Sequence, residues 1–192
     1  MLIAAYIVLA IAFGINLMLL FHRCMSAVQI RLSHGLVATL VIVAIQTGLF
    51  MLGMLFGNLL RFELPEQTDA FARTNALVCM GLTVFVAVRS LLPYLRREPR
   101  LPLFKIALWM PVVGMALATG INHFLLGLGC GFVASLSADF HKVLWPMLVL
   151  QFLIGYWGLM LGRQKGKIRP RRWEVVAVVL MIGVAVAAVV NS

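Results

Sequence analysis

The sequence predicts an all-α integral membrane protein whose six transmembrane helices form two inverted three-helix repeats. Three observations predict this fold class. Hydrophobic residues make up 63% of the 192-residue chain and charged residues only 11%, whereas a soluble domain carries about 25% charged residues. Apolar runs long enough to cross a bilayer occur six times, and a motif in the first run recurs in the fourth. Because so few polar side chains are available to cover the surface, we expect lipid to cover it.

The predicted helices follow from the length of the apolar runs, because a helix needs about 20 apolar residues to cross the hydrocarbon core. They cover residues 2–21, 35–60, 75–95, about 106–126, 143–162 and 173–190. The first has no charged residue and lies before the basic residues, which is the reverse of a signal peptide, so we expect it to be retained. Three glycines, Gly127, Gly129 and Gly131, are expected to loosen the chain after the fourth span.

Basic residues alternate between the predicted loops. The first, third and fifth loops carry twelve of the sixteen lysines and arginines, the second and fourth carry three, and Arg89 lies inside the third span. Basic loops stay in the cytoplasm, so we expect both termini outside the cytoplasm in a bacterial-type inner membrane. This accounts for the formal net charge of +10 without nucleic acid. The expected partners are the lipid bilayer and a transported ion or small solute, and a homodimer is compatible with the sequence.

The first and fourth spans share a motif. Residues 14–24 and 120–130 are identical at six of eleven positions, including Gly-Ile-Asn at the start of each segment. The second and fifth spans also match, with Gln46, Gly53 and Gly57 corresponding to Gln151, Gly158 and Gly162. We therefore divide the chain into residues 1–95 and 96–192, two copies of a three-helix unit that together form one membrane domain. Because three is odd, the second copy enters the membrane from the opposite side, as in many secondary transporters.

Four amide side chains inside the spans are the candidate substrate or ion pathway: Asn16, Asn122, Gln46 and Gln151. An unpaired amide in lipid costs several kcal/mol, so each must face protein or water. Two interpretations stay open, namely hydrogen bonds that hold helices together and a site near the membrane midplane between the repeats. Six glycines are interpreted as structural residues that let helices approach closely: Gly14, Gly120, Gly53, Gly57, Gly158 and Gly162.

His123 and Met18 are the candidate metal ligands or proton carriers. Imidazole titrates near neutral pH, and a thioether can bind a soft metal. A hydrogen-bonded structural histidine and a packing methionine are the alternatives. The three cysteines, which lie in or beside apolar runs without CxxC spacing, are interpreted as small hydrophobic residues. None of the six acidic residues lies mid-span and no catalytic motif occurs. We therefore expect that the protein is not an enzyme, that it has no catalytic residues and that it binds no cofactor.

These motifs resemble those of the MntP family of manganese efflux pumps, which belongs to the LysE superfamily. Residues 12–16 and 118–122 are similar to the family's first-span and fourth-span motifs, and residues 44–47 with Gly53 and Gly57 are similar to its second-span motif. Residues 85–89 resemble the end of the third span in that family. The resemblance covers nearly the whole chain and implies a six-span inner-membrane transporter that exports manganese(II) by alternating access.

The chain departs from the family at the residues that carry charge. The family has aspartates at the positions of Asn16 and Asn122 and a glutamate at the position of Gln46. A hard divalent cation prefers carboxylate oxygens, so three functions stay open. These are export of a metal cation through an amide-lined site, export of a small uncharged or zwitterionic solute by a related exporter, and a membrane scaffold or degenerate paralogue without transport.

Overall fold

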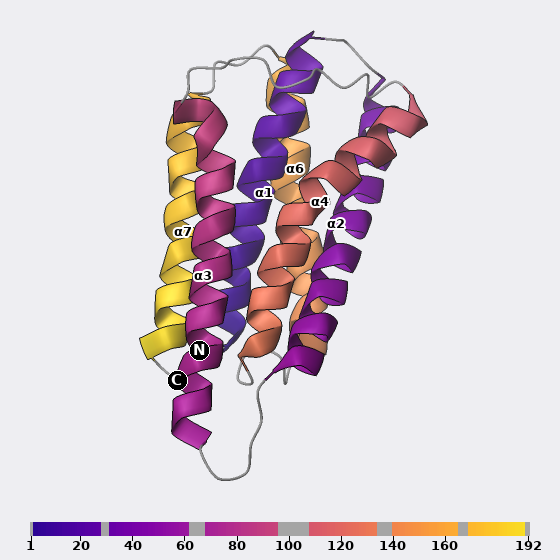
Figure 1. Cartoon of the computed structure of the whole chain (residues 1–192). Coiled ribbons are helices and arrows are strands. Elements are labelled where there is room, and N and C mark those ends of the chain that lie inside the picture. The colour runs from indigo at the N-terminus through magenta and orange to yellow at the C-terminus, as the bar shows by residue number, and fades with distance from the viewer. Residues whose placement is uncertain are drawn as a thin grey trace.

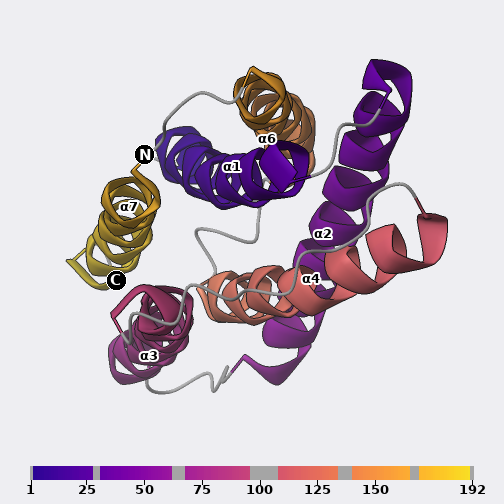
Figure 2. The same ribbon diagram turned by 90° about the horizontal axis from the view of Figure 1, so that it is seen from above.

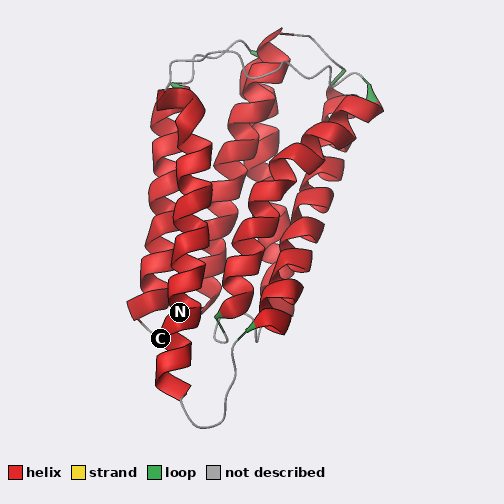
Figure 3. Ribbon diagram, viewed as in Figure 1, coloured by secondary structure: helices red, strands yellow, loops and turns green. Residues whose placement is uncertain are grey.

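The computed structural model describes residues 2–27, 31–61, 68–95, 108–133, 140–164 and 169–190. The helices are α1 (Leu2–Ala27), α2 (Leu32–Leu60), α3 (Thr68–Leu95), α4 (Trp109–Phe132), α6 (Phe140–Arg163) and α7 (Pro170–Val190). All six are long and apolar enough to cross a membrane, and no strand occurs in the described ranges (Figure 1, Figure 3). The predicted all-α class is therefore confirmed, and six helices that are long and apolar enough to cross a membrane fit a multi-pass membrane protein.

Most helices extend beyond the apolar runs that predicted them. α1 continues from residue 21 to Ala27, and α3 begins at Thr68 rather than at residue 75. The extensions contain polar and charged residues, which an apolar-run criterion leaves out although their backbones still form helical hydrogen bonds. The apolar run measures the hydrocarbon core of the membrane, and the helix is longer than that core.

The glycine-rich end of α4 is helical. The helix passes through Gly127, Gly129 and Gly131 and ends at Phe132, so the expectation that these glycines loosen the chain after the fourth span is wrong. All three are buried. Glycine in a helix interior costs about 1 kcal/mol relative to alanine, and the close packing of α4 on α2 described below offsets this cost.

The six helices pack as interleaved pairs. α2 packs most extensively against α4, and α1 against α6. α1 also contacts α7, α4 also contacts α3, and α3 and α7 pack against each other on one side of the bundle (Figure 2). α1 begins and α7 ends at the same end of the bundle (Figure 1). Arg23, Arg163 and Arg171 lie near the other end, because α1 and α6 finish there and α7 starts there.

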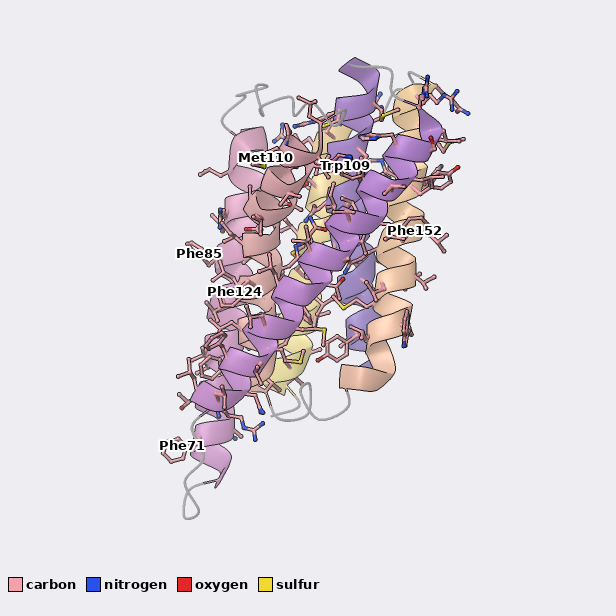
Figure 4. The ribbon with its side chains drawn as sticks, turned by 90° about the vertical axis from the view of Figure 1, so that its right-hand side faces the viewer. Phe71, Phe85, Trp109, Met110, Phe124 and Phe152 are labelled. Carbon is pink, nitrogen blue, oxygen red and sulfur yellow. The ribbon has the colours of Figure 1, made fainter. Side chains whose placement is uncertain are left out.

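The core contains aromatic and sulfur-containing side chains, while large apolar side chains also point outward. Tyr6, Phe13 and Phe50 are at most 1% exposed. On the outer surface, Phe85 and Met110 are among the exposed apolar side chains, and they project away from the bundle (Figure 4). An outer surface of this kind is unfavourable in water and favourable in contact with lipid.

Candidate functional site

The contact between α2 and α4 brings two helix backbones together. A Cβ atom added at Gly53 would collide with the carbonyl oxygen of Phe124, and one added at Gly127 would collide with the carbonyl oxygen of Phe50. The other two glycines of this contact are Gly57, against the Leu128 carbonyl, and Gly131, against the Met54 carbonyl. Only glycine leaves room for this approach, which fixes how α2 and α4 present their neighbouring side chains.

The contact between α1 and α6 is built in the same way. A Cβ atom at Gly158 would collide with the backbone of Met18, and one at Gly162 would lie 2.7 Å from the carbonyl oxygen of His22. Met18 is 1% exposed and belongs to the apolar core. Met18 therefore packs against Gly158 of α6 and against apolar side chains of the core.

The remaining two glycines face side chains of a neighbouring helix. A Cβ atom at Gly14 would lie 2.8 Å from the Cβ of Ile154, and one at Gly120 would collide with the Leu49 side chain. Since Gly14 and Gly120 begin the two Gly-Ile-Asn motifs, each motif starts where its helix packs closely on a neighbour.

An aromatic contact joins α1, α2 and α4 at the centre of the candidate site. The rings of Phe13 and His123 lie 4.0 Å apart between centroids at an interplanar angle of 35°. Phe13 also packs edge-on against Phe50 of α2, with 5.7 Å between ring centroids. Asn16 follows Phe13 by three residues and Asn122 directly precedes His123, so both asparagines lie within one helical turn of this contact.

His123 is buried with one ring nitrogen available. Its Nδ1 lies 3.4 Å from the carbonyl oxygen of Thr119, and since a carbonyl only accepts, Nδ1 carries the proton of the neutral ring. Nε2 is then the lone-pair nitrogen, and it is buried without a hydrogen-bond partner among the described residues. A buried imidazole nitrogen in this state can accept a hydrogen bond or bind a metal ion.

Gln46 is connected to the same part of α4. Its Nε2 donates a 2.7 Å hydrogen bond to Oγ1 of Thr119, which itself donates to the carbonyl oxygen of Met115 at 2.8 Å. Gln46 is 2% exposed, and its Oε1 accepts no hydrogen bond within the described ranges. The predicted glutamine and histidine therefore both contact Thr119, a residue that the sequence argument left outside the site.

The two asparagines also leave oxygens unpaired. Nδ2 of Asn122 donates to Oγ of Ser90 on α3 at 3.3 Å, while its Oδ1 is buried without a partner in the part of the chain that the structure describes. Oδ1 of Asn16 is in the same state. Gln151 of α6 is fully buried, and neither atom of its amide group has a described partner.

The unpaired atoms of the candidate site are therefore mainly acceptors. They are Asn16 Oδ1, Gln46 Oε1, Asn122 Oδ1, His123 Nε2 and both polar atoms of Gln151. They come from α1, α2, α4 and α6. Buried acceptors of this kind are costly when unpaired, and each of them can accept a hydrogen bond or bind a cation.

Two residues that contribute to the site were not predicted as site residues. Thr119 lies inside the fourth-span motif, and its spacing of four residues from His123 is the signal that indicates a shared helix face. Ser90 has no signal in the sequence beyond its position near the end of the third span. Outside the site, Glu174 of α7 is only 4% exposed and lies close enough to Arg23 for electrostatic attraction, which an apolar-run criterion does not predict.

We predict that Gln151→Met will raise the thermal stability of the protein by more than Gln46→Met does. Methionine keeps a similar volume, and removing a buried unpaired amide recovers about 1–3 kcal/mol. At position 46 the same change also removes the hydrogen bond to Thr119, a loss of about 1 kcal/mol. The measurement is thermal unfolding of the purified protein in detergent, and a destabilised Gln151→Met variant would contradict the assignment of an unpaired amide.

The chemistry of the site is that of amide oxygens and one imidazole. No group of three or more His, Cys, Asp or Glu side chains that could hold a metal ion occurs in the described ranges. A cation at this site would therefore depend on Asn16, Gln46, Asn122, Gln151 and His123. Comparisons with known protein families, with curated proteins and with solved structures found no match to this chain, so its function has to be inferred from its own residues.

Proposed function

We propose that this protein is a secondary transporter of the manganese-exporter type, which moves a metal cation out of the cell across a bacterial-type inner membrane by alternating access. The observation that carries the proposal is the set of buried, unpaired acceptors around the contact of Phe13 with His123. A purely structural amide that is buried would be expected to use both its nitrogen and its oxygen in hydrogen bonds. Here Gln46 and Asn122 use their nitrogens in this way, and their oxygens stay available.

The proposal includes two inverted three-helix repeats, residues 1–95 and 96–192. What supports them is a set of contacts that correspond between the halves. Gly53 packs on Phe124, and Gly158 packs on Met18. Gly158 is the counterpart of Gly53 at an offset of 105 residues, and Met18 is the counterpart of Phe124 at an offset of 106. The contact of Gly14 with Ile154 corresponds in the same way to that of Gly120 with Leu49. Corresponding contacts are what a pseudo-twofold axis between the halves requires.

Interleaved packing suits alternating access. The first helix of each half, α1 or α4, packs against the second helix of the other half, α6 or α2. The two halves can therefore exchange equivalent contacts, and the site between α1 and α4 then opens first to one side and then to the other. The basic residues near one end of the bundle support a cytoplasmic position for that end, with both termini outside.

The donor set supports a cation. Manganese(II) accepts oxygen ligands, and imidazole nitrogen is a ligand for many transition metals. Amide oxygens attract a divalent ion less strongly than carboxylates do, which is compatible with an exporter because the ion has to leave the site again. In this proposal Asn16, Gln46, Asn122 and Gln151 line the pathway, and His123 supplies Nε2.

A second candidate function is export of a small zwitterionic solute. The observation that favours it is Gln151, whose amide leaves a donor as well as an acceptor unpaired within the described structure. A donor is of no use to a metal ion, but it can bind a carboxylate group. Thermal unfolding of the purified protein discriminates the two candidates, because a ligand that binds the folded state raises the melting temperature. Manganese(II) should raise it under the first proposal, and an amino acid under the second.

We predict that the wild-type protein will lower cellular manganese in a host without its own exporter, and that Asn16→Ala/Asn122→Ala will not. The double variant removes two of the acceptor oxygens and leaves the glycine contacts in place. Asn58→Ala is the matched control, because Asn58 is an exposed amide on α2. The measurement is metal content after manganese challenge, with membrane insertion checked. Full activity of the double variant would contradict a role of the asparagines, and a wild type without effect would contradict manganese export.

A further inference from the structure

A second cluster of polar side chains lies between α3 and α4, and it is built from sulfur. Cys79 of α3 and Cys130 of α4 are free thiols that are 2% and 3% exposed. A Cβ atom added at Gly129 would lie 3.4 Å from Cα of Cys79, so the two helices are in contact beside Cys130. The two thiol groups lie close enough to interact directly.

Two further side chains lie at this position from two other helices. The hydroxyl of Tyr6 on α1 donates to Sδ of Met54 on α2 across 3.9 Å. Tyr6 also lies within electrostatic range of both cysteines, and all four residues belong to one apolar core cluster. Four helices therefore bring two thiols, a thioether and a hydroxyl group together in a buried place.

We propose that this cluster binds one soft monovalent metal ion, copper(I) or silver(I). Thiolates and thioethers are the ligands that such an ion prefers. The thiolates of Cys79 and Cys130 would be the two main ligands, and the thioether of Met54 would be the third. Binding of one ion by two thiols releases two protons to water, and no electron is transferred. A hard ion such as manganese(II) prefers oxygen ligands, so we expect this cluster and the amide site to bind different ions.

The cluster lies closer to one end of the bundle than to the other. Cys130 lies two residues before the end of α4, Tyr6 four residues after the start of α1, and Met54 six residues before the end of α2. At 1.5 Å per residue, these side chains begin about 3–9 Å from the helix ends. The cluster therefore lies towards the end of the bundle where α1 begins and α7 ends (Figure 1). Cys79 is farther from the end of its own helix, because it follows the start of α3 by eleven residues, about 16 Å.

The test is a copper(I) titration of the full-length protein in detergent, kept reduced and free of oxygen, against a coloured copper(I) chelator such as bicinchoninate. We expect the wild type to take about one ion per chain. Changing an outer-shell partner of a metal already costs about 10–100-fold in affinity, so loss of a ligand in Cys79→Ser or Cys130→Ser should cost more than about 100-fold. Met54→Leu, which keeps the apolar volume, should cost less than either serine variant.

Cys24→Ser is the matched control. Cys24 is also buried, at 4% exposure, but it belongs to a different core cluster, and the serine variant should bind copper(I) like the wild type. Circular dichroism checks that each variant is folded, and a large excess of manganese(II) should not displace the copper. The proposal is overturned if the wild type takes no copper(I), if both serine variants at 79 and 130 bind it like the wild type, or if Cys24→Ser loses as much affinity.

Discussion

Replacing Gly53 with alanine is expected to destabilise the protein strongly, while the same change at Gly48 in the same helix is not. A Cβ atom at position 53 collides with the backbone carbonyl oxygen of Phe124, which cannot rotate away as a side chain can. Overpacking a core typically costs about 1–3 kcal/mol of stability and occasionally more. We expect a collision with the backbone to cost an amount at the upper end of this range. At Gly48 no atom of the described residues lies within 4 Å of the added carbon, and alanine improves helix propensity by up to about 1 kcal/mol.

The three buried cysteines provide the measurement. A thiol-reactive fluorescent dye labels Cys24, Cys79 and Cys130 only when unfolding exposes them, so the fluorescence of a heated sample reports the melting temperature. For a chain of this size, 3 kcal/mol corresponds to roughly 6–12 °C. Gly127→Ala and Gly114→Ala form a second matched pair in α4, since Gly127 faces backbone and Gly114 faces open space. Equal melting temperatures within both pairs would contradict the close approach of α2 and α4.

These glycines also mark the limit of what the sequence predicts about the fold. The six spans follow from apolar length alone, because a bilayer sets the length of a helix that crosses it. The glycines at 127, 129 and 131 predict a loosened chain after the fourth span, since glycine lowers helix propensity. Whether a glycine ends a helix or lets another helix approach depends on the neighbour, and a linear sequence does not contain the neighbour. The sequence does contain one indication, because Gly53 and Gly57 on α2 have the same spacing of four residues as Gly127 and Gly131 on α4.

The polar residues of the site were predictable, but their hydrogen bonds were not. A polar side chain within an apolar span is rare enough to be noticed, and this indicated Asn16, Gln46, Asn122 and Gln151. Their partners lie on other helices and depend on how those helices pack. Gln46 and Gln151 match in the sequence, yet only Gln46 has a hydrogen bond to a described residue, with Thr119. The counterpart of Thr119 in the other half is Phe13, which has no hydroxyl group to accept such a bond.

The largest functional effect is expected from introducing carboxylates at positions 16, 46 and 122, where the MntP family, which this chain resembles, has acidic residues. The triple variant Asn16→Asp/Asn122→Asp/Gln46→Glu should bind manganese(II) at least about 100-fold more tightly than the wild type. Two unit charges about 4 Å apart attract by about 4 kcal/mol at an effective dielectric constant of 20, and a divalent ion doubles this. Desolvation of each buried carboxylate opposes the gain by several kcal/mol. A net gain of about 3 kcal/mol is enough for the stated effect, which the manganese dependence of the melting temperature measures.

Asn58→Asp is the control for this variant, because it makes the same chemical change at an exposed position of α2 and should leave manganese binding unchanged. If the triple variant binds no more tightly, the amide oxygens do not share a cation site, and the acceptors around His123 need another explanation. If it binds tightly and exports manganese while the wild type does neither, the helices form an exporter whose own substrate is not a divalent cation. The unpaired Nε2 of Gln151 would then favour the zwitterionic solute, because this nitrogen can donate a hydrogen bond to a carboxylate but cannot bind a metal ion.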